Sequence, residues 1–333
     1  MNDPPAPSKP AIRPLVALCW LAALALAGCA VARLAAHDAT MVLIWVNSFT
    51  LYFYLPVYPV LVAALCRRRW RLAGASAAVA GCHLAWVLPD FAPAAKLPDH
   101  LDRGVSLRIV SANLFAGNPS RERLAKELLD ADADVLLLQE YSPSWVKVLQ
   151  SAGLFEKYPH RVFKVRADAF GIALFSKWPL SDAEIWRVSD LPMARATVHV
   201  GDARLRVVNV HPLPPRSPQY VRVWNEQLAA LAEELAEETG PVVAVGDYNA
   251  TQHSAWHRRL TSGRMRSAHL DRGRGWAITW PNGQMRLPPI RIDHALLSPE
   301  VACREIAEGE GAGSDHQPLV VDLVILPAED TGR

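Results

Sequence analysis

The sequence predicts an α/β domain preceded by a membrane region of three transmembrane helices. Before residue 91 the chain contains long stretches that are almost free of charge. After residue 100, short β-branched runs alternate with segments of helical periodicity, which is typical of an α/β domain. Several of these runs end in acidic, amide or imidazole side chains. A functional site built at strand ends is therefore expected.

Residues 1–91 form the predicted membrane region. Three apolar segments, 15–36, 41–66 and 72–88, are each about as long as the roughly 20 residues needed to cross a bilayer. Pro56 and Pro59 are expected to kink the second segment without preventing insertion, because helix breakers are tolerated inside membrane bundles. A buried soluble helix is the alternative, but residues 15–29 lack the polar stripe that such a helix would show.

Charge around these segments predicts the orientation of the chain. The loop Arg67-Arg68-Arg69-Trp70-Arg71 should remain in the cytoplasm, because short arginine-rich loops do so. With three spans, everything after Phe91 then lies outside, as expected for a multi-pass protein of a bacterial inner membrane with a periplasmic domain. The sequence Leu26-Ala27-Gly28-Cys29 also resembles a lipoprotein attachment box, and that alternative places the large domain on the same side.

A proline-rich linker, residues 92–99, is predicted between the membrane region and a domain at 100–326, which a short tail at 327–333 follows. Of 35 Lys and Arg, 8 precede His100, and of 33 Asp and Glu, 4 do, so the remainder has a formal charge of about −2. A domain that binds nucleic acid mainly through phosphates would show a strong basic excess. Cys303 is the domain's single cysteine, which excludes an internal disulfide.

Apolar and β-branched runs predict the strands of this domain, and amphipathic segments predict its helices. Asn118-Pro119-Ser120 reads as a helix start, followed by an apolar face of leucines. Gly201-Asp202 indicates a hairpin turn, and a second helix is expected at 221–238. The expected strands are 107–112, 135–138, 171–175, 194–200, 205–210, 242–245, 292–297 and 319–326.

Seven short motifs lie within these strands or next to their ends. They are Asn113, Leu138-Gln139-Glu140, Gly171-Ile172-Ala173-Leu174-Phe175-Ser176, Asn209-Val210-His211, Gly246-Asp247-Tyr248-Asn249, Arg291-Ile292-Asp293-His294 and Ser314-Asp315-His316. Over residues 107–323 this series resembles the endonuclease/exonuclease/phosphatase superfamily. The resemblance implies a four-layer α/β sandwich, in which two packed mixed sheets are flanked by helices and the site lies at one end of the sheets.

The resemblance and the chemistry of the side chains together give the candidate site. Glu140 ends an apolar strand, where a hard cation with oxygen ligands would remove the cost of burying a carboxylate. By resemblance that cation is Mg²⁺ or Mn²⁺, and Asn113 and Asp315 lie beside it. The predicted catalytic residues are His211, Asp247, Asn249, Asp293 and His316.

Each catalytic residue has an expected role. Asp247 would align or deprotonate the attacking water, and Asn249 would orient a phosphate oxygen without adding charge. Asp293 would fix the tautomer of His316 and raise its basicity. His211, as an imidazolium, would neutralise the phosphorane or protonate the leaving oxygen.

The sequence thus predicts a membrane-anchored, divalent-metal-dependent phosphoester hydrolase, a phosphodiesterase that attacks in line with an activated water outside the cytoplasm. Its partners are the lipid bilayer and a phosphoester of a lipid, nucleotide or nucleic acid, and no protein partner is identified. One alternative is an extracytoplasmic DNA or RNA nuclease, with Trp224, Trp256, Trp276 and Trp280 as candidate stacking aromatics. The other is a catalytically silent membrane sensor or binding module with the same fold.

Overall fold

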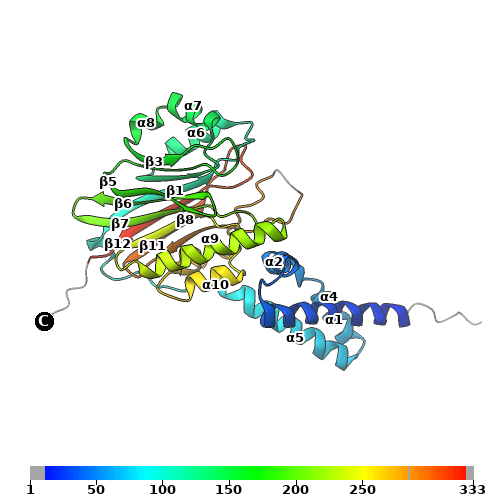
Figure 1. Ribbon diagram of the computed structural model, residues 1–333. Coiled ribbons are helices and arrows are strands. Elements are labelled where there is room, and N and C mark those ends of the chain that lie inside the picture. The colour runs from blue at the N-terminus through cyan, green and yellow to red at the C-terminus, as the bar shows by residue number, and fades with distance from the viewer. Residues whose placement is uncertain (1–11, 284–285, 328–333) are drawn as a thin grey trace, which may run out of the picture. The chain divides into compact units, whose positions relative to one another are not determined.

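The computed structural model describes residues 12–283 and 286–327, so the predicted tail lies outside the described residues except for Pro327. The chain forms two compact units, with the boundary between Val87 and Leu88 (Figure 1). The first contains helices, and the second contains both sheets.

The first unit consists of apolar helices. Its bounds are α1 Ile12–Ala36, α2 Met41–Ser48, α3 Thr50–Phe53, α4 Val57–Cys66 and α5 Trp70–Val87. Among the described residues, Pro14–Ala36 and Trp70–Phe91 are long and apolar enough to cross a membrane. The second predicted span is broken, since Met41–Ser48 and Thr50–Cys66 meet at a bend of 77°. The count is therefore two candidate spans, or three if the bent pair is one span, and three transmembrane helices remains a prediction.

The position of this bend differs from the expected proline kink. The chain turns at Phe49, between α2 and α3, whereas Pro56 caps the start of α4 and Pro59 lies within that helix. Polar contacts gather near this turn: the Arg33 guanidinium donates to Asn47 Oδ1 at 3.2 Å and to Thr50 Oγ1 at 2.5 Å. A buried cation in an apolar unit requires such partners.

The second unit contains two six-stranded mixed sheets, confirming that part of the expected sandwich (Figure 1). The first sheet has the order β11-β12-β1-β2-β4-β3 and the second β5-β6-β7-β8-β10-β9. The strand bounds are β1 Val105–Asn113, β2 Val135–Gln139, β3 His160–Lys164, β4 Ile172–Ser176, β5 Leu180–Val188, β6 Leu191–Val200, β7 Ala203–Val210, β8 Val242–Asp247, β9 Arg266–Ser267, β10 Asp293–Leu297, β11 Val301–Glu308 and β12 Leu319–Ile325.

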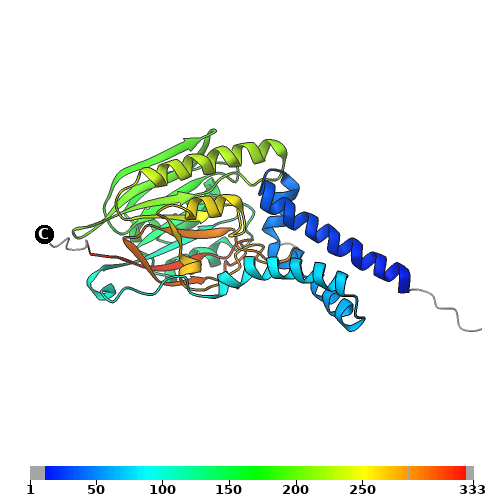
Figure 2. The same ribbon diagram turned by 90° about the horizontal axis from the view of Figure 1, so that it is seen from below.

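The alternation of side chains along each strand builds two apolar layers. In β1, Ile109 packs between the sheets with Val207 and Val245, whereas Val110 faces Leu124 and Leu128 on the outer side. Helices α6 Arg121–Asp130, α7 Pro143–Ser151 and α8 Leu154–Lys157 cover that outer face. Helices α9 Pro218–Glu237, α10 Ala255–Thr261 and α11 Ala268–Asp271 belong to the second sheet's side, and Figure 2 shows the yellow-green α9 running along its strands.

All eight expected strands are present, and four further strands were missed: β3, β5, β9 and β11. Each missed strand lies at an edge of its sheet. Edge strands carry more polar and charged side chains than central ones, and β5, with the sequence LSDAEIWRV, is half-exposed or exposed along its length. The apolar pattern that identifies a central strand is therefore weak at these positions.

Two parallel strand pairs place the predicted site residues. Helix α6 connects β1 to β2, and α9 connects β7 to β8, so each pair ends at the same edge of its sheet. Asn113 consequently lies opposite Gln139, which precedes Glu140, and Val210 lies opposite Gly246. Gly246 has φ +152°, and a Cβ there would lie 2.1 Å from the Val210 carbonyl oxygen, so this close approach requires glycine.

The residues predicted as a linker, 92–99, lie against the second unit. The Ala94 amide donates to the Leu270 carbonyl at 2.9 Å, and the Arg272 guanidinium donates to the Ala95 carbonyl at 2.6 Å. Preceding them is a short 3-10 helix, η1, at Leu88–Phe91. The compact second unit thus includes residues that precede Asp99.

Candidate active site

Strand ends from both sheets bring the predicted catalytic residues together. Asp247 ends β8 and lies directly opposite Asp293, the first residue of the antiparallel strand β10. His316, from the loop before β12, reaches both: its Nδ1 lies 2.9 Å from Asp293 Oδ2 and its Nε2 lies 3.7 Å from Asp247 Oδ2. These three buried side chains each offer one atom within 4.8 Å of the others.

His211 and Asn249 complete the set around Asp247. His211 follows β7, and its Nε2 lies 3.7 Å from Asp247 Oδ2. Asn249 has φ +48°, its backbone amide donates to Asp247 Oδ1 at 2.8 Å, and its side-chain amide donates to the Pro212 carbonyl at 3.0 Å. These bonds fix the turn that carries both residues.

His316 and His211 have different protonation states at neutral pH. Burial lowers the pKa of His316, but the carboxylates of Asp293 and Asp247 outweigh this effect and raise the pKa to about 10. For His211, burial and the charge on His316 lower the pKa to about 4. At neutral pH His316 is therefore an imidazolium and His211 a neutral imidazole, which differs from the imidazolium expected for His211.

Asp247 has the protonation behaviour of a general base. Burial raises its pKa to about 7, while the neighbouring His316 lowers it and Asp293 raises it. A carboxyl group that titrates near neutral pH can accept a proton from water in the pH range where an enzyme operates. The neutral state of His211 leaves an imidazole N–H available as a hydrogen-bond donor.

Glu140 and Asp315 have the environment expected of cation ligands. Burial raises the pKa of Glu140, although the Ala116 amide donates to its Oε2 at 2.6 Å. The Trp280 indole donates to Asp315 Oδ2 at 3.3 Å, whereas the buried Asp315 Oδ1 has no hydrogen-bond partner in the described chain. A hard cation with oxygen ligands would relieve both the desolvated carboxylate and the unpaired oxygen.

Asn113 links this side of the site to the catalytic carboxylate. Its Nδ2 donates to Asp247 Oδ2 at 3.3 Å, and its Oδ1 accepts from the Phe115 amide at 3.0 Å while retaining a second lone pair. The compact group Asp247, Asp293 and His316 is the other possible cation site. In this group His316 Nδ1 and Asp293 Oδ2 already contact each other at 2.9 Å, which leaves His316 Nε2 and the Asp247 carboxyl group facing the site.

Supporting residues that were not singled out as site residues lie immediately below. The Gln139 amide donates to Asn209 Oδ1 at 2.6 Å, and the Asn209 amide donates to the Leu138 and Ala173 carbonyls, so this buried pair joins the two sheets. Thr279 Oγ1 accepts from the Asp293 amide at 3.2 Å. Gln139 and Asn209 lie within the recognised motifs, whereas nothing in the sequence distinguishes Thr279.

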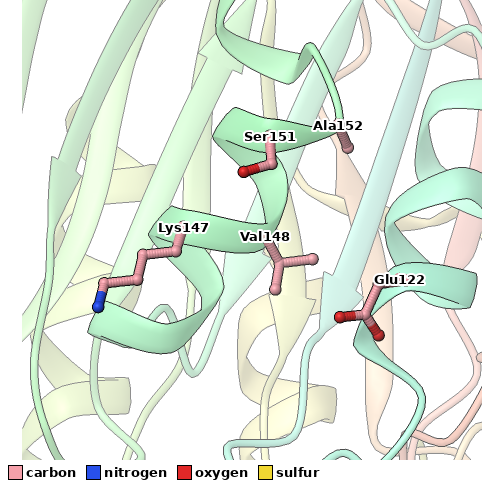
Figure 3. Close-up of a pocket in the computed structure, with 5 residues that line it drawn as sticks. All are labelled: Glu122, Lys147, Val148, Ser151 and Ala152. Atoms are coloured by element: carbon pink, nitrogen blue, oxygen red, sulfur yellow. The ribbon is translucent and has the colours of Figure 1, made fainter.

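Surface features elsewhere do not coincide with this site. A hollow of about 320 Å³ over α6 and α7 is lined by Glu122, Lys147, Val148, Ser151 and Ala152, none of which belongs to the predicted site (Figure 3). Of the candidate stacking aromatics, Trp224 is fully buried and donates to the Tyr248 carbonyl, so it cannot stack on a base, whereas Trp276 is 70 % exposed.

Comparisons with known proteins identify relatives of this chain. The model of the Endonuclease/Exonuclease/phosphatase family matches residues 110–316. A UPF0294 protein of Vibrio cholerae is 26 % identical over 238 residues, covering 68 % of this chain and 80 % of the relative.

Solved structures share the fold. An endonuclease/exonuclease/phosphatase from Beutenbergia cavernae has a TM-score of 0.53 and 18 % identity, covering 67 % of this chain and 72 % of that one. D. rerio TDP2, complexed with a single-strand DNA product, has a TM-score of 0.54 and 19 % identity, covering 66 % and 98 %. Since the family model spans more than half of the sequence, the chain belongs to the Endonuclease/Exonuclease/phosphatase family and is an enzyme of the metal-dependent phosphoester hydrolase class.

Proposed function

We propose that this protein is a membrane-anchored phosphodiesterase that requires Mg²⁺ or Mn²⁺ and acts outside the cytoplasm. The observation that supports it most is the buried group of Asp247, Asp293 and His316 beside the metal-ligand candidates Glu140 and Asp315. This group combines a carboxyl group with a pKa of about 7 and an imidazolium with a pKa of about 10. Proton transfer and stabilisation of an anionic transition state require such a pair.

The side chains suggest one course for the reaction. Asp247 accepts a proton from the water that attacks phosphorus in line with the leaving oxygen. As the bond to the leaving oxygen breaks, the His316 imidazolium, held at Nδ1 by Asp293, donates its Nε2 proton to that oxygen. The neutral His211 stabilises the negative charge that develops on the phosphoryl oxygens, and Asn249 orients one of them. A cation held by Glu140, Asp315 and Asn113 would neutralise phosphate charge on the other side of the site.

A nuclease is the second candidate function, supported by the likeness to D. rerio TDP2, whose structure contains a single-strand DNA product. The formal charge of about −2 after His100 and the burial of Trp224 favour a small or lipid phosphodiester instead. The full chain in detergent, with Mg²⁺, should hydrolyse lipid or nucleotide phosphodiesters faster than single-stranded DNA. His316→Ala is the control, and a preference for DNA would favour the nuclease.

The membrane topology is also a proposal. The arginine loop at 67–71 lies between α4 and α5 and should remain in the cytoplasm. With three spans, the second unit is then expected outside. A reporter that is active only outside the cytoplasm, fused after Arg333, should be active. If instead a cytoplasmic reporter is active at that position, the orientation is reversed.

A further inference from the structure

Residues 88–95, here called the strap, directly follow α5 and pack on the catalytic unit. The strap begins within the candidate span Trp70–Phe91, and the Phe91 ring meets the edge of the Trp276 ring at a centroid distance of 5.2 Å. The Ala94 and Ala95 backbone bonds to Leu270 and Arg272 hold its other end. The last candidate membrane helix therefore continues into a segment that is bonded to the hydrolase unit.

Asp90, in the middle of the strap, is buried against the turn that follows the Asp247–Asn249 motif. It is 7 % exposed, and its Oδ2 accepts from Gln252 Nε2 at 3.1 Å and lies 3.8 Å from His253 Nε2. Gln252 comes three residues after Asn249, whose amides bond Asp247 and the Pro212 carbonyl. The Asp90 carboxylate of the strap thus helps to fix the position of this turn.

Arg291 is a buried arginine two residues before Asp293, and the charge of Asp90 acts on it. Arg291 is 2 % exposed; its Nη1 donates to the Arg274 carbonyl at 2.7 Å, and within the described residues its Nε and Nη2 have no hydrogen-bond partner. Burial lowers its pKa to about 10, against the charges of Asp90 and then Glu308, while Arg274 adds to the lowering. A buried guanidinium is costly unless such charges compensate it.

Three buried histidines, His257, His269 and His294, form a neighbouring group, and a histidine cannot supply negative charge in either protonation state. The His257 ring lies 4.7 Å from the His294 ring, and the His269 ring lies 6.1 Å from it. Burial lowers the pKa of each, and the Arg291 charge contributes to the lowering, so all three are neutral at pH 7. Asp90 and Glu308 are therefore the negative charges that oppose the lowering of the Arg291 pKa.

We propose that Asp90 is a positioning residue of the hydrolase site: from the end of the last apolar helix it orders both loops that carry Asp247, Asn249 and Asp293. The inference rests on the proposed function for its catalytic consequence, but its structural part can be tested independently.

The test uses the full chain in detergent with four variants: Asp90→Asn, Arg291→Gln, the double variant, and Asp102→Asn as a control. The Asp102 side chain is 95 % exposed, so it controls for the loss of one acidic charge from the same unit. Asp90→Asn should lower kcat by about 10- to 100-fold with KM little changed, since small misplacements of catalytic groups have effects of that order. The double variant should recover part of the loss, because no unbalanced charge remains.

Hydrogen exchange separates this proposal from the proposed function. In Asp90→Asn, amides of residues 249–253 and 291–293 should exchange faster than in Asp102→Asn, with the rest of the unit unchanged. Unchanged exchange at these residues, or equally faster exchange throughout the unit, would overturn the positioning role even in an active enzyme. Absence of hydrolysis by the wild type would overturn the proposed function instead. If Asp90→Asn does not fold, Gln252→Leu should still loosen residues 249–253, and unchanged exchange there would reject the proposal.

Discussion

The Asp293–His316 hydrogen bond is the contact on which the proposed chemistry depends most. Both side chains are buried, at 3 % and 5 % exposure, and their Oδ2 and Nδ1 atoms are 2.9 Å apart. Raising the pKa of His316 from 6.5 to about 10 corresponds to roughly 5 kcal/mol in favour of the imidazolium. Asp293 is the largest of the charges that raise this pKa. Asp293→Asn should therefore remove most of that preference.

The pH dependence follows from the sign of the shift. Because the folded pKa of His316 lies above 6.5, its stabilising contribution is complete below pH 6.5 and is lost as pH rises to about 10. In the metal-free wild type, the free energy of unfolding should fall by a few kcal/mol from pH 7 to pH 10, and in Asp293→Asn it should fall less. Starting at pH 7 avoids most of the loss expected from Asp247, which occurs between pH 3.8 and about 7.

Activity provides the second half of this test. General acid–base groups contribute about 100- to 10,000-fold, so His316→Ala and Asp293→Ala should each lower kcat by that order. Because the two act through one hydrogen bond, the double variant should be little worse than the worse single variant. Rates on a generic phosphodiester at saturating Mg²⁺ decide the matter. Fully multiplicative losses would refute the pairing, and wild-type rates in His316→Ala would remove that residue from the mechanism.

Three further predictions concern neighbouring groups. Glu140→Gln should weaken both the activity and its dependence on Mg²⁺ concentration, and an unchanged Mg²⁺ titration would exclude Glu140 as a ligand. The same change should stabilise the metal-free protein at pH 7, because burial raises the pKa of Glu140 and the stabilising contribution of this residue is lost as pH rises above 4.5. His211→Asn should make the protein less sensitive to acid. Because the folded pKa of His211 is about 4, the wild type loses roughly 3 kcal/mol of its free energy of unfolding as pH falls from 6.5 to 4, and unfolding midpoints at pH 7 and 4.5 would measure the difference. Gln139→Leu should cost about 1–3 kcal/mol by leaving Asn209 partly unpaired, and an unchanged unfolding midpoint would contradict this.

The strands that sequence could predict are the central ones. β2 and β8 read as continuous apolar runs because both of their faces are covered, and every residue in them is buried. The strands β3, β5, β9 and β11 lie at the four sheet edges, where one side is not paired and polar side chains are tolerated. These strands form because a neighbouring strand supplies their hydrogen-bond partners, and the local sequence does not show where that strand lies.

The candidate site also has features that the sequence could predict and features that it could not. Its residue types could be predicted because Asn113, Glu140, His211 and Asp247 each end or directly follow an apolar strand. The protonation states could not, because the neutral His211 depends on burial and on the nearby charge of His316, more than a hundred residues further along the chain. These quantities arise from the packing of two sheets.

The two sheets contribute different functional groups to the site. The first sheet supplies Asn113 and Glu140, the oxygen ligands proposed for the cation, and the second supplies His211 and Asp247. Buried polar contacts that join these halves include those of the Gln139 and Asn209 amides below the site, and those of Asn113 and His316 with the carboxylates of the second sheet. A slight shift of one sheet against the other would separate the proposed base from the proposed cation while both apolar layers stayed intact. Activity should therefore be lost in Gln139→Leu at temperatures well below the unfolding midpoint.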